Sequence, residues 1–393
     1  MTVLINLSVL FDRPTGITTY ANNLVPHLKP LDPTLLIARS RSGFRCYAIA
    51  DNLSPAHGSR GHLRRLWWTQ VELPRIYRKL QSSLIFSPVP EAPLYRKSRF
   101  VVMVHDLIPL RFPQLFARSP LIPYFRWYIP QVLAQAQHII CNSQATARDI
   151  TDFWNIPAKK ITPIPLAYDS NHFKPLSPKK ALNEEIASQK DAQQLLSSKK
   201  ALNEELSQEA REDFSTKRPY FLYIGRHDPY KNLQRVIEAF AKLGDRHCQL
   251  WIAGACDPRY TPALQQQAQE LEVSDRVQFL EYVPYAQLPL LLNRAIALVF
   301  PSLWEGFGIP VLEAMACGTP VITSNCSSLP EVAGEAAILV DPYAVGEIRA
   351  AMQLLLEDGE TRSQLVQLSL KRASLFSWEK TGRQTMEVLQ QYC

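Results

Sequence analysis

The sequence predicts an α/β protein with two doubly wound domains, and three observations lead to this fold class. Apolar runs of strand type alternate with helical patterns up to residue 169, the same alternation starts again at Tyr220, and a polar stretch without strand signals separates the two series. With 393 residues, 46% of them hydrophobic, the chain can bury two cores. Two such domains facing each other are expected to leave a ligand-binding cleft between the carboxyl edges of their sheets.

The first domain is predicted to span residues 1–175. Short apolar runs mark its strands, and longer periodic patterns with helix-start signals mark its helices. In chain order the sequence predicts a strand at 3–10, a helix at 16–28, a strand at 34–39, a basic helix at 60–79, strands at 83–88 and 99–106, a long helix near 119–137, a strand at 138–143, a helix from 144 and a strand at 161–169.

Residues 176–217 are expected to form a charged helical insertion in the linker between the domains. The stretch is dense in Lys, Glu, Gln and Ser, and KKALNEEI at 179–186 recurs as KKALNEEL at 199–206. At about 100° per residue, the offset between the copies places them on nearly opposite helix faces, so a repeated binding stripe is not predicted. No chemistry is assigned to this segment.

The second domain is predicted to span residues 218–375 and to follow the same alternation. Its elements are a strand at 221–225, a helix at 229–243, strands at 249–255 and 276–283, a helix, a strand at 297–302, a helix from Pro310, and strands at 320–324 and 336–341. A last helix at 376–393 is expected to pack back across the first domain.

Positive charge is concentrated in the first half of the chain. Residues 1–178 contain 21 Lys and Arg against 9 Asp and Glu, whereas residues 179–393 contain 22 against 27. Much of the excess lies at 60–79, where basic residues accompany Trp67 and Trp68. This pattern suits a surface that contacts anionic lipid headgroups, and it equally suits a helix with core tryptophans and solvated arginines. Nucleic acid is a weaker expectation, because no recognised binding motif accompanies the charge.

The seven cysteines, at positions 46, 141, 248, 256, 317, 326 and 393, form no CxxC pair and have no paired histidines nearby. They are expected to be free thiols of a reducing compartment, without a zinc site. The opening MTVLINLSVL has no basic leader, and no apolar run approaches the roughly 18 residues of a spanning helix. The protein is therefore expected in the cytoplasm, and at the inner face of the membrane if the basic segment binds lipid.

A candidate ligand-binding turn lies at 300–323, which reads FPSLWEGFGIPVLEAMACGTPVIT. The pattern is that of a strand, a glycine-containing turn, a helix starting at Pro310 and a second strand, which together make a βαβ unit. Glu305 falls in the loop after the strand, and Glu313 in the first turn of the helix. At this sheet edge a helix N-terminus attracts phosphate, and a carboxylate accepts hydrogen bonds from sugar hydroxyls.

The spacing of the two glutamates is uninformative by itself, because two other glutamate pairs in the chain share it. In a purely structural interpretation, Glu313 complements the helix dipole and Glu305 caps a loop. Gly306 and Gly308 favour ligand binding, since they let a ligand approach the backbone. A dinucleotide-binding fingerprint is excluded, because Val311 stands where its third glycine should be.

The stretch YIGRHDPYKN at 223–232 predicts an anion site in the second domain. Gly225 stands at a strand end, and Arg226 and Lys231 lie around the start of the next helix. A planar guanidinium and a compact ammonium can together neutralise a diphosphate. The alternative is that Lys231 is only a surface lysine in the first turn of a helix. This is disfavoured, because the N-terminal end of a helix attracts anions and repels a positively charged side chain.

These motifs resemble those of retaining glycosyltransferases with the GT-B architecture, a large group marked by EGFG(I/L)PxLEAMAxGxPV. The chain also carries RPTGITTY at 13–20, HDLIPLRFP at 105–113 and FSWEKTG at 376–382, which match further motifs of that family, and the resemblance covers nearly all of the chain except 176–217. One departure is Ala167 in PLAYD, where the family usually has glycine. The residues that match the main pattern are Glu305, Gly306, Phe307, Gly308, Pro310, Glu313, Ala314, Gly318 and Pro320.

The resemblance implies a nucleotide-sugar donor held by the second domain and an acceptor docked on the first. Glu313 would accept hydrogen bonds from the ribose, and Arg226 and Lys231 would hold the diphosphate. Glu305 and Gly306 would face the transferred sugar, and the backbone N–H groups of Phe307, Gly308 and Ile309 would contact its hydroxyls. Gly16 would let the loop of the first domain approach the diphosphate, and His105 would reach the sugar from the other side of the cleft.

The resemblance also implies a retaining hexosyltransferase that needs no cofactor. Metal independence is expected because the chain has no Asp-x-Asp triplet. Fixed cations and a helix N-terminus would stabilise the departing diphosphate, and the acceptor would attack from the same face, so that no residue acts as nucleophile. The HDLIPLRFP motif resembles that of mannosyltransferases of cell-surface polysaccharide assembly, which favours GDP-mannose as donor and a glycan or lipid-linked acceptor.

Two other functions fit the same fold. An epimerase or hydrolase of nucleotide sugars needs carboxylates as acid and base, and the first domain offers only Asp12 and Asp106 at loop edges. A non-catalytic nucleotide-sugar binder is disfavoured by the charge pair Arg226 and Lys231 and by His105. Incubation with labelled donors separates the three, because it yields transfer, hydrolysis or neither.

Overall fold

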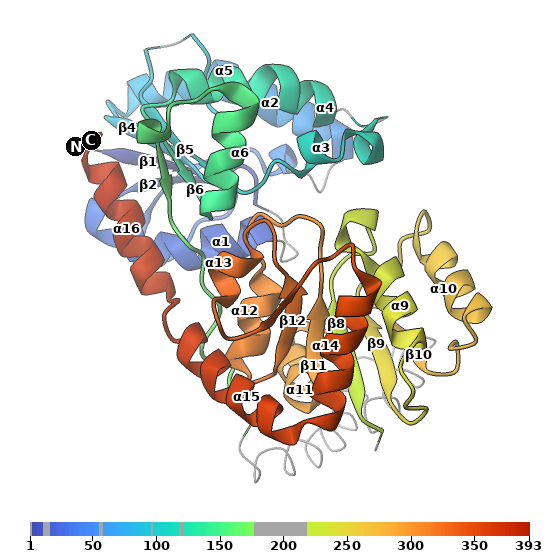
Figure 1. The fold of residues 1–393 in the computed structure, drawn as a ribbon. Coiled ribbons are helices and arrows are strands. Elements are labelled where there is room, and N and C mark those ends of the chain that lie inside the picture. Colours follow the sequence, from blue (N-terminus) through green and yellow to red (C-terminus); the bar gives the residue numbers. More distant parts are fainter. Residues whose placement is uncertain are drawn as a thin grey trace, which may run out of the picture. The chain divides into compact units, whose positions relative to one another are not determined.

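The computed structural model describes residues 2–10, 16–54, 58–95, 97–117, 119, 121–176 and 218–393 (Figure 1). They form two compact units, which are described separately. The first comprises Met1–Tyr168, Trp304–Ile309 and Phe376–Cys393, and the second comprises Asp169–Leu303 and Pro310–Leu375. The expected insertion at 176–217, with both KKALNEE copies, lies outside the described residues apart from Leu176.

Two segments belong to a different unit from the one that the sequence predicts. Residues 169–175 pack in the second unit, where the ring of His172 stacks on that of Tyr285 with 4.2 Å between centroids. The turn Trp304–Ile309 packs in the first unit, where the ring of Phe307 lies 6.1 Å from that of Phe376. Tertiary contacts, rather than position in the chain, decide both assignments.

The first unit contains a seven-stranded parallel sheet in the order β3-β2-β1-β4-β5-β6-β7. Its central strands are buried apolar runs, as expected for a parallel sheet covered on both faces. The edge strand β3 was not predicted, because its sequence RCYA is partly exposed and has no apolar run. The strands are β1 (Val3–Asn6), β2 (Thr34–Ile37), β3 (Arg45–Ala48), β4 (Leu84–Ser87), β5 (Phe100–Val104), β6 (His138–Cys141) and β7 (Ile161–Pro163).

The helices of the first unit largely follow the prediction. The long helix expected near 119–137 is confirmed as one continuous helical stretch over 121–135, made of α4 (Leu121–Pro123), a π-helical segment η5 (Tyr124–Tyr128) and α5 (Ile129–Gln135). Pro130 has no N–H to donate to the preceding turn, which fits the local change from α to π geometry. The others are α1 (Gly16–Leu24), η1 (Val25–Leu31), η2 (Asp51–Leu53), α2 (Gly58–Lys79), α3 (Ile108–Arg111), η4 (Pro113–Phe116), α6 (Gln144–Trp154), η6 (Ala158–Lys160) and α16 (Trp378–Gln390).

The C-terminal helix α16 packs on the first unit. Its N-cap residue, Ser377, accepts a hydrogen bond from the N–H of Lys380. Further along the helix, the Thr381 hydroxyl donates to the carbonyl oxygen of Pro165 at 2.8 Å, and the Tyr392 hydroxyl lies 3.0 Å from Nδ1 of His138. These contacts tie the end of the chain to β6 and to the segment that follows β7.

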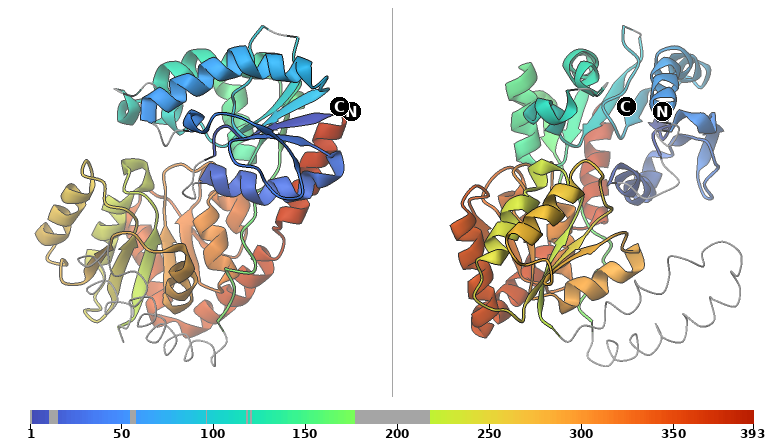
Figure 2. Two further views of the ribbon diagram at one scale, coloured as in Figure 1. Left: turned by 180° about the vertical axis from the view of Figure 1, so that it is seen from behind. Right: turned by 90° about the vertical axis from the view of Figure 1, so that its right-hand side faces the viewer.

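The second unit contains a six-stranded parallel sheet in the order β10-β9-β8-β11-β12-β13, with helices on both faces (Figure 2). The order reverses between β8 and β11, and in open α/β sheets ligands bind at the carboxyl ends of the strands at such a switch point. The strands are β8 (Tyr220–Ile224), β9 (Gln249–Ala253), β10 (Val277–Leu280), β11 (Ala297–Phe300), β12 (Val321–Ser324) and β13 (Ile338–Val340).

The helix predicted at 229–243 begins later than expected. A 3₁₀ turn, η8 (Pro229–Lys231), comes first, and Asn232 has a φ of 67° before α9 (Leu233–Ala241) starts. Asparagine is one of the few residues that tolerate this left-handed conformation. The other helices are α10 (Thr261–Glu270), η9 (Tyr285–Gln287), α11 (Leu288–Arg294), α12 (Ile309–Ala316), α13 (Leu329–Ala333), α14 (Val345–Glu357) and α15 (Gly359–Ala373).

All seven cysteines lie in the described part of the chain and are free thiols, as expected. No helix among the described residues combines the length and the apolar character needed to cross a bilayer.

Candidate functional site

The two residues of the second unit that are predicted to bind phosphate, Arg226 and Lys231, both contact the side chain of Tyr230. Nη2 of Arg226 donates to the Tyr230 hydroxyl at 2.9 Å, and Nζ of Lys231 lies 5.3 Å from the centre of the same ring. The Lys231 ammonium also lies 5.2 Å from the ring of Phe300, the last residue of β11. The structure therefore brings both cations to the switch point between β8 and β11.

Arg226 also pairs with an acidic side chain. Its Nε lies 2.9 Å from a carboxylate oxygen of Asp228, while 69% of its side chain is exposed. Asp228 is buried, so it can orient the guanidinium. Such an exposed fork suits the bidentate binding of a phosphate.

Asn232, to which sequence reasoning assigned no role, connects three loops of this edge. Its Nδ2 donates to the carbonyl oxygens of Pro301 at 2.9 Å and of Pro342 at 2.7 Å. The side chain is 2% exposed. Asn232 therefore fixes the loop that carries Lys231 against the loops after β11 and β13.

The loops after β8 and β9 touch through glycine. A Cβ atom on Gly254 would lie 1.9 Å from the carbonyl oxygen of Gly225, so any larger residue would push the two loops apart. This close approach leaves the carboxyl ends of both strands lined by backbone.

Glu313 lies in the second turn of α12, not in the first turn as predicted, because the helix begins at Ile309. The influence of the helix dipole falls off beyond the first turn, so dipole pairing does not explain this carboxyl group. Burial raises the pKa of Glu313 to about 8. A half-buried carboxyl group of this kind is stabilised as an anion when hydroxyl groups donate to it.

The turn at Glu305–Ile309 lies against the loop that follows β5 (Phe100–Val104). A Cβ atom on Gly306 would lie 2.1 Å from the carbonyl oxygen of His105, and the φ of Gly308 is 105°, so both positions require glycine. Glu305 is buried, with 8% of its surface exposed. The structure therefore brings Gly306, and with it the turn that carries Glu305, against the backbone of His105. Binding of a sugar by these residues stays a prediction.

His105 is a neutral imidazole whose protonated nitrogen can be identified. Its Nε2 lies 2.9 Å from the carbonyl oxygen of Pro88, which can only accept, so Nε2 carries the proton and Nδ1 carries the lone pair. Burial lowers the pKa of His105 to about 4. The ring of Tyr20 packs edge-on against the imidazole, with 5.0 Å between centroids.

The remaining predicted residues are less informative. Gly16 is exposed at the start of α1, and a Cβ atom there would meet nothing within 4 Å. Asp12, the first candidate acid of the alternative enzymes, lies outside the described residues. Asp106, the second, accepts from the N–H of Ile108 at 3.0 Å and so caps the turn that leads into α3.

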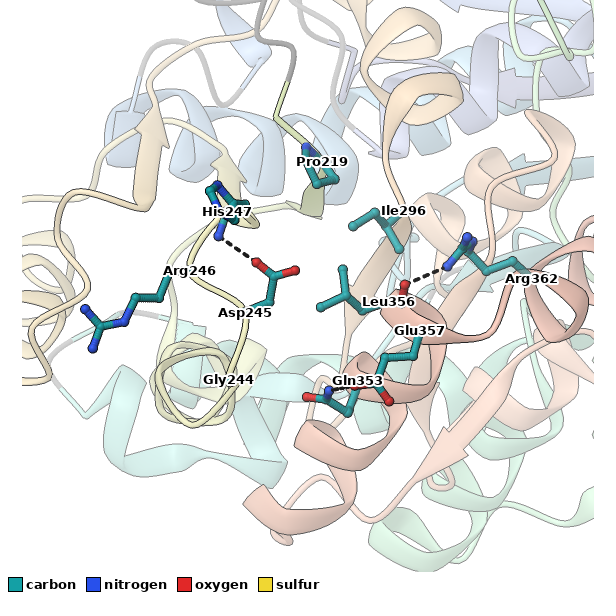
Figure 3. A pocket seen from close by; sticks show the side chains of 10 residues that line it. All are labelled: Pro219, Gly244, Asp245, Arg246, His247, Ile296, Gln353, Leu356, Glu357 and Arg362. Carbon is teal, nitrogen blue, oxygen red and sulfur yellow. Dashed lines mark hydrogen bonds between the residues drawn. The ribbon is translucent and has the colours of Figure 1, made fainter.

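A hollow of about 860 Å³ opens at the other end of the second sheet (Figure 3). Two lining residues, Pro219 and Ile296, directly precede β8 and β11, which places the hollow at the amino ends of these strands. Two of its charged residues bond to nearby backbone: Asp245 accepts from the N–H of His247, and Arg362 donates to the carbonyl oxygen of Leu356. It is therefore distinct from the predicted donor site.

Among the described residues, no three His, Cys, Asp or Glu side chains gather in a way that could hold a metal ion. Independence from metal stays a prediction.

Two family profiles match most of the chain between them. The profile described as glycosyl transferases group 1 matches residues 204–372, and the profile of glycosyltransferase family 4 matches residues 14–172. The first match begins within the stretch predicted as a linker insertion, and the predicted domain bounds stay predictions.

Individual proteins of known name are similar over much of the chain. O-antigen chain mannosyltransferase B of Escherichia coli is 30% identical over 298 residues, which cover 74% of this chain and 70% of the relative. O-antigen chain mannosyltransferase RfbU of Salmonella typhimurium is 27% identical over 352 residues, with 86% and 87% covered. The crystal structure of Anabaena Alr3699/HepE in complex with UDP-glucose shares the fold, with a TM-score of 0.71, 17% identity and full coverage of both chains.

Proposed function

Because this chain belongs to the glycosyltransferases of group 1 and family 4, we propose that it moves a hexose from a nucleoside-diphosphate sugar to a glycan or lipid-linked acceptor, with retention at the anomeric carbon. The observation that carries the proposal is the pair of cations, Arg226 and Lys231, on Tyr230 at the sheet's switch point. Mannose is the favoured sugar, since two relatives are named as mannosyltransferases.

The proposed roles follow the chemistry of each group. Arg226 and Lys231 neutralise the diphosphate. Glu313 accepts hydrogen bonds from the ribose hydroxyls, which would stabilise the charged form of its buried carboxyl group. Glu305 and the N–H groups of Phe307, Gly308 and Ile309 bind hydroxyls of the transferred sugar, and Gly16, the first residue of α1, contacts the diphosphate.

His105 is proposed to contact the sugar as a neutral acceptor. Because the Nε2–H group donates to the carbonyl oxygen of Pro88, the imidazole presents its Nδ1 lone pair to a sugar hydroxyl. Its lowered pKa keeps it uncharged at neutral pH, so it does not repel the positive charge that develops on the sugar.

The reaction needs no protein nucleophile. The bond between the anomeric carbon and the phosphate oxygen breaks with its electron pair going to the diphosphate. The acceptor oxygen forms the new bond on the same face and gives its proton to a diphosphate oxygen. The chain's contribution is electrostatic, since Arg226 and Lys231 stabilise the charge that develops on the leaving group. No metal ion is required in this scheme.

Incubation with radiolabelled GDP-mannose, UDP-glucose and UDP-galactose in the presence of EDTA tests the proposal. We expect label to move from one donor to octyl α-mannoside or to a lipid extract. Release of free sugar alone would favour a hydrolase, conversion of the donor sugar would favour an epimerase, and binding without turnover would favour a non-catalytic binder.

A second part of the proposal concerns the basic helix α2. Trp68 is core, with 7% of its surface exposed, whereas Trp67 is 60% and Leu63 is 65% exposed. The adjacent segment η5 presents Trp127, which is 71% exposed. The two elements touch, since Nε2 of Gln70 lies 3.0 Å from the Tyr128 hydroxyl.

The charge of α2 suits anionic lipid. Arg60, Arg64 and Arg75 are exposed, whereas Arg65 is buried and paired with Glu91 at 2.7 Å. Large apolar side chains beside exposed arginines are typical of surfaces that bind the headgroup region of a membrane. We propose that this face docks the protein on an anionic membrane, where a lipid-linked acceptor would lie.

A further inference from the structure

A buried polar cluster at the start of α6 has no place in the scheme above. It consists of Asn142, Ser143 and Thr146, whose side chains are 3%, 3% and 1% exposed. The cluster directly follows β6 and belongs to the same unit as the turn Trp304–Ile309. Three buried polar side chains in one place require partners.

Two hydroxyl groups of the cluster converge on the carbonyl oxygen of Gly306. The Ser143 hydroxyl lies 2.7 Å from that oxygen, and the Thr146 hydroxyl lies 3.3 Å from it. Ser143 Oγ also accepts from the N–H of Thr146 at 3.0 Å. Because a carbonyl oxygen only accepts, the single hydroxyl proton of Ser143 is directed to Gly306.

The same cluster holds the other predicted sugar ligand. Nδ2 of Asn142 donates to the carbonyl oxygen of His105 at 2.8 Å, and Oδ1 of Asn142 lies 3.1 Å from the Thr146 hydroxyl. Thr146 has one hydroxyl proton, and the shorter distance assigns it to Asn142 Oδ1. A chain of hydrogen bonds therefore runs from His105 through Asn142, Thr146 and Ser143 to Gly306.

Helix capping does not account for this arrangement. A cap requires only that Ser143 Oγ accept from Thr146 N, as it does here. It does not require the Thr146 hydroxyl, the Asn142 amide or a partner 163 residues away in the chain. These additional groups all lead to Gly306 and His105.

We propose that Asn142, Ser143 and Thr146 are positioning residues that clamp the Glu305–Ile309 turn to the backbone of His105. The clamp orients Glu305, the N–H groups of the turn and the imidazole, and so determines how well they meet the sugar during transfer. This inference rests on the proposed function, because it assigns the turn and His105 to the sugar. The nucleotide is assigned to residues of the second unit, so the clamp is proposed to affect the transfer step and not nucleotide affinity.

The test compares Ser143→Ala and Thr146→Val with Asp358→Ala in the full-length protein. Thr146→Val keeps the helix cap of α6 and removes only a hydroxyl. Asp358→Ala is the matched control, because it removes the cap of α15, where Asp358 accepts from the N–H groups of Glu360 and Thr361. Three quantities are measured: hydrogen exchange in peptides covering 304–309, GDP binding by calorimetry, and kcat for sugar transfer from the active donor.

We expect faster exchange at 304–309 and a fall in kcat of roughly tenfold or more in both clamp variants, with GDP affinity unchanged. Asp358→Ala should show neither effect. Ser143→Thr, which keeps the hydroxyl, should have the exchange rate at 304–309 and the kcat of the wild-type protein. Unchanged exchange at the turn, or a loosened turn with wild-type kcat, would overturn the positioning role. If the wild-type protein transfers no sugar at all, the proposed function fails, and exchange then decides alone whether the clamp exists.

Discussion

The carbonyl oxygen of His105 occupies the space that a side chain on Gly306 would need: a Cβ atom there would lie 2.1 Å from it. Backbone meets backbone at this point, so no rotamer change can relieve the clash. The contact joins two groups that are far apart in the sequence and that are both proposed to bind the transferred sugar.

Gly306→Ala should therefore separate the turn from His105 and lower kcat by roughly 10²-fold, because catalytic groups displaced by about 1 Å lose that much. Gly346→Ala is the control, since a Cβ atom at Gly346 would meet nothing within 4 Å. Steady-state kinetics and thermal unfolding of both variants give the answer. Wild-type kcat in Gly306→Ala would show that the contact has no part in catalysis.

Arg226→Ala and Lys231→Ala should each reduce turnover by roughly 10²-fold or more, since a charge-assisted contact to the leaving group is lost. Melting temperature should barely change for Arg226→Ala, because that side chain is 69% exposed. Lys242→Ala is a suitable control, because Lys242, which directly follows α9, pairs with Glu238 of that helix at the protein surface. Full activity in both variants would refute the assignment of the diphosphate site.

Glu313 should make the unliganded protein less stable as pH rises. Its pKa is raised from the ordinary 4.5 to about 8, so between these values the folded protein keeps a proton that the unfolded chain has released. The free energy of unfolding then falls with rising pH across this window. Melting temperatures of wild type and Glu313→Gln between pH 5 and pH 8 should diverge, with the steeper decline in wild type. Parallel curves would contradict the raised pKa.

Membrane binding should depend on the exposed aromatic residues of the first unit. The wild-type protein should sediment with phosphatidylglycerol vesicles and be released by salt, because charge attraction is screened over about 8 Å at physiological ionic strength. Trp67→Ala and Trp127→Ala should weaken sedimentation. Leu354→Ala, at a side chain 42% exposed on α14, should not. Equal binding to neutral vesicles, or none to either kind, would favour a simple solvated helix.

Local patterns in the sequence were sufficient to predict most of the fold. The strands β4, β5, β6, β8, β11 and β12 are short apolar runs, and each was expected where it lies. The failures have local physical causes as well: β3 is a partly exposed edge strand, and Asn232, with its positive φ, delays the start of the helix that was expected from Pro229.

The site was only partly predictable. The glycines and cations of the two motifs lie in strand-end loops as expected. Neighbouring residues are enough to recognise both the motif and the strand and helix on either side of it. The roles of Asn142, Ser143, Thr146 and Asn232 depend on partners that the fold brings from distant parts of the chain, such as Gly306 and Pro342. No local pattern distinguishes such residues from ordinary caps and turns.

The central claim is that a nucleoside diphosphate binds at the carboxyl ends of β8 and β11 through Arg226, Lys231 and Glu313. Isothermal titration of GDP, UDP and ADP into the wild-type protein, Lys231→Ala and Lys242→Ala tests it most directly. The account predicts that at least one nucleotide, with GDP favoured, binds wild type and Lys242→Ala equally and Lys231→Ala at least about tenfold more weakly, because a charge-assisted contact is lost. Binding that is undiminished in Lys231→Ala, or no binding of any nucleotide to the wild-type protein, would contradict it.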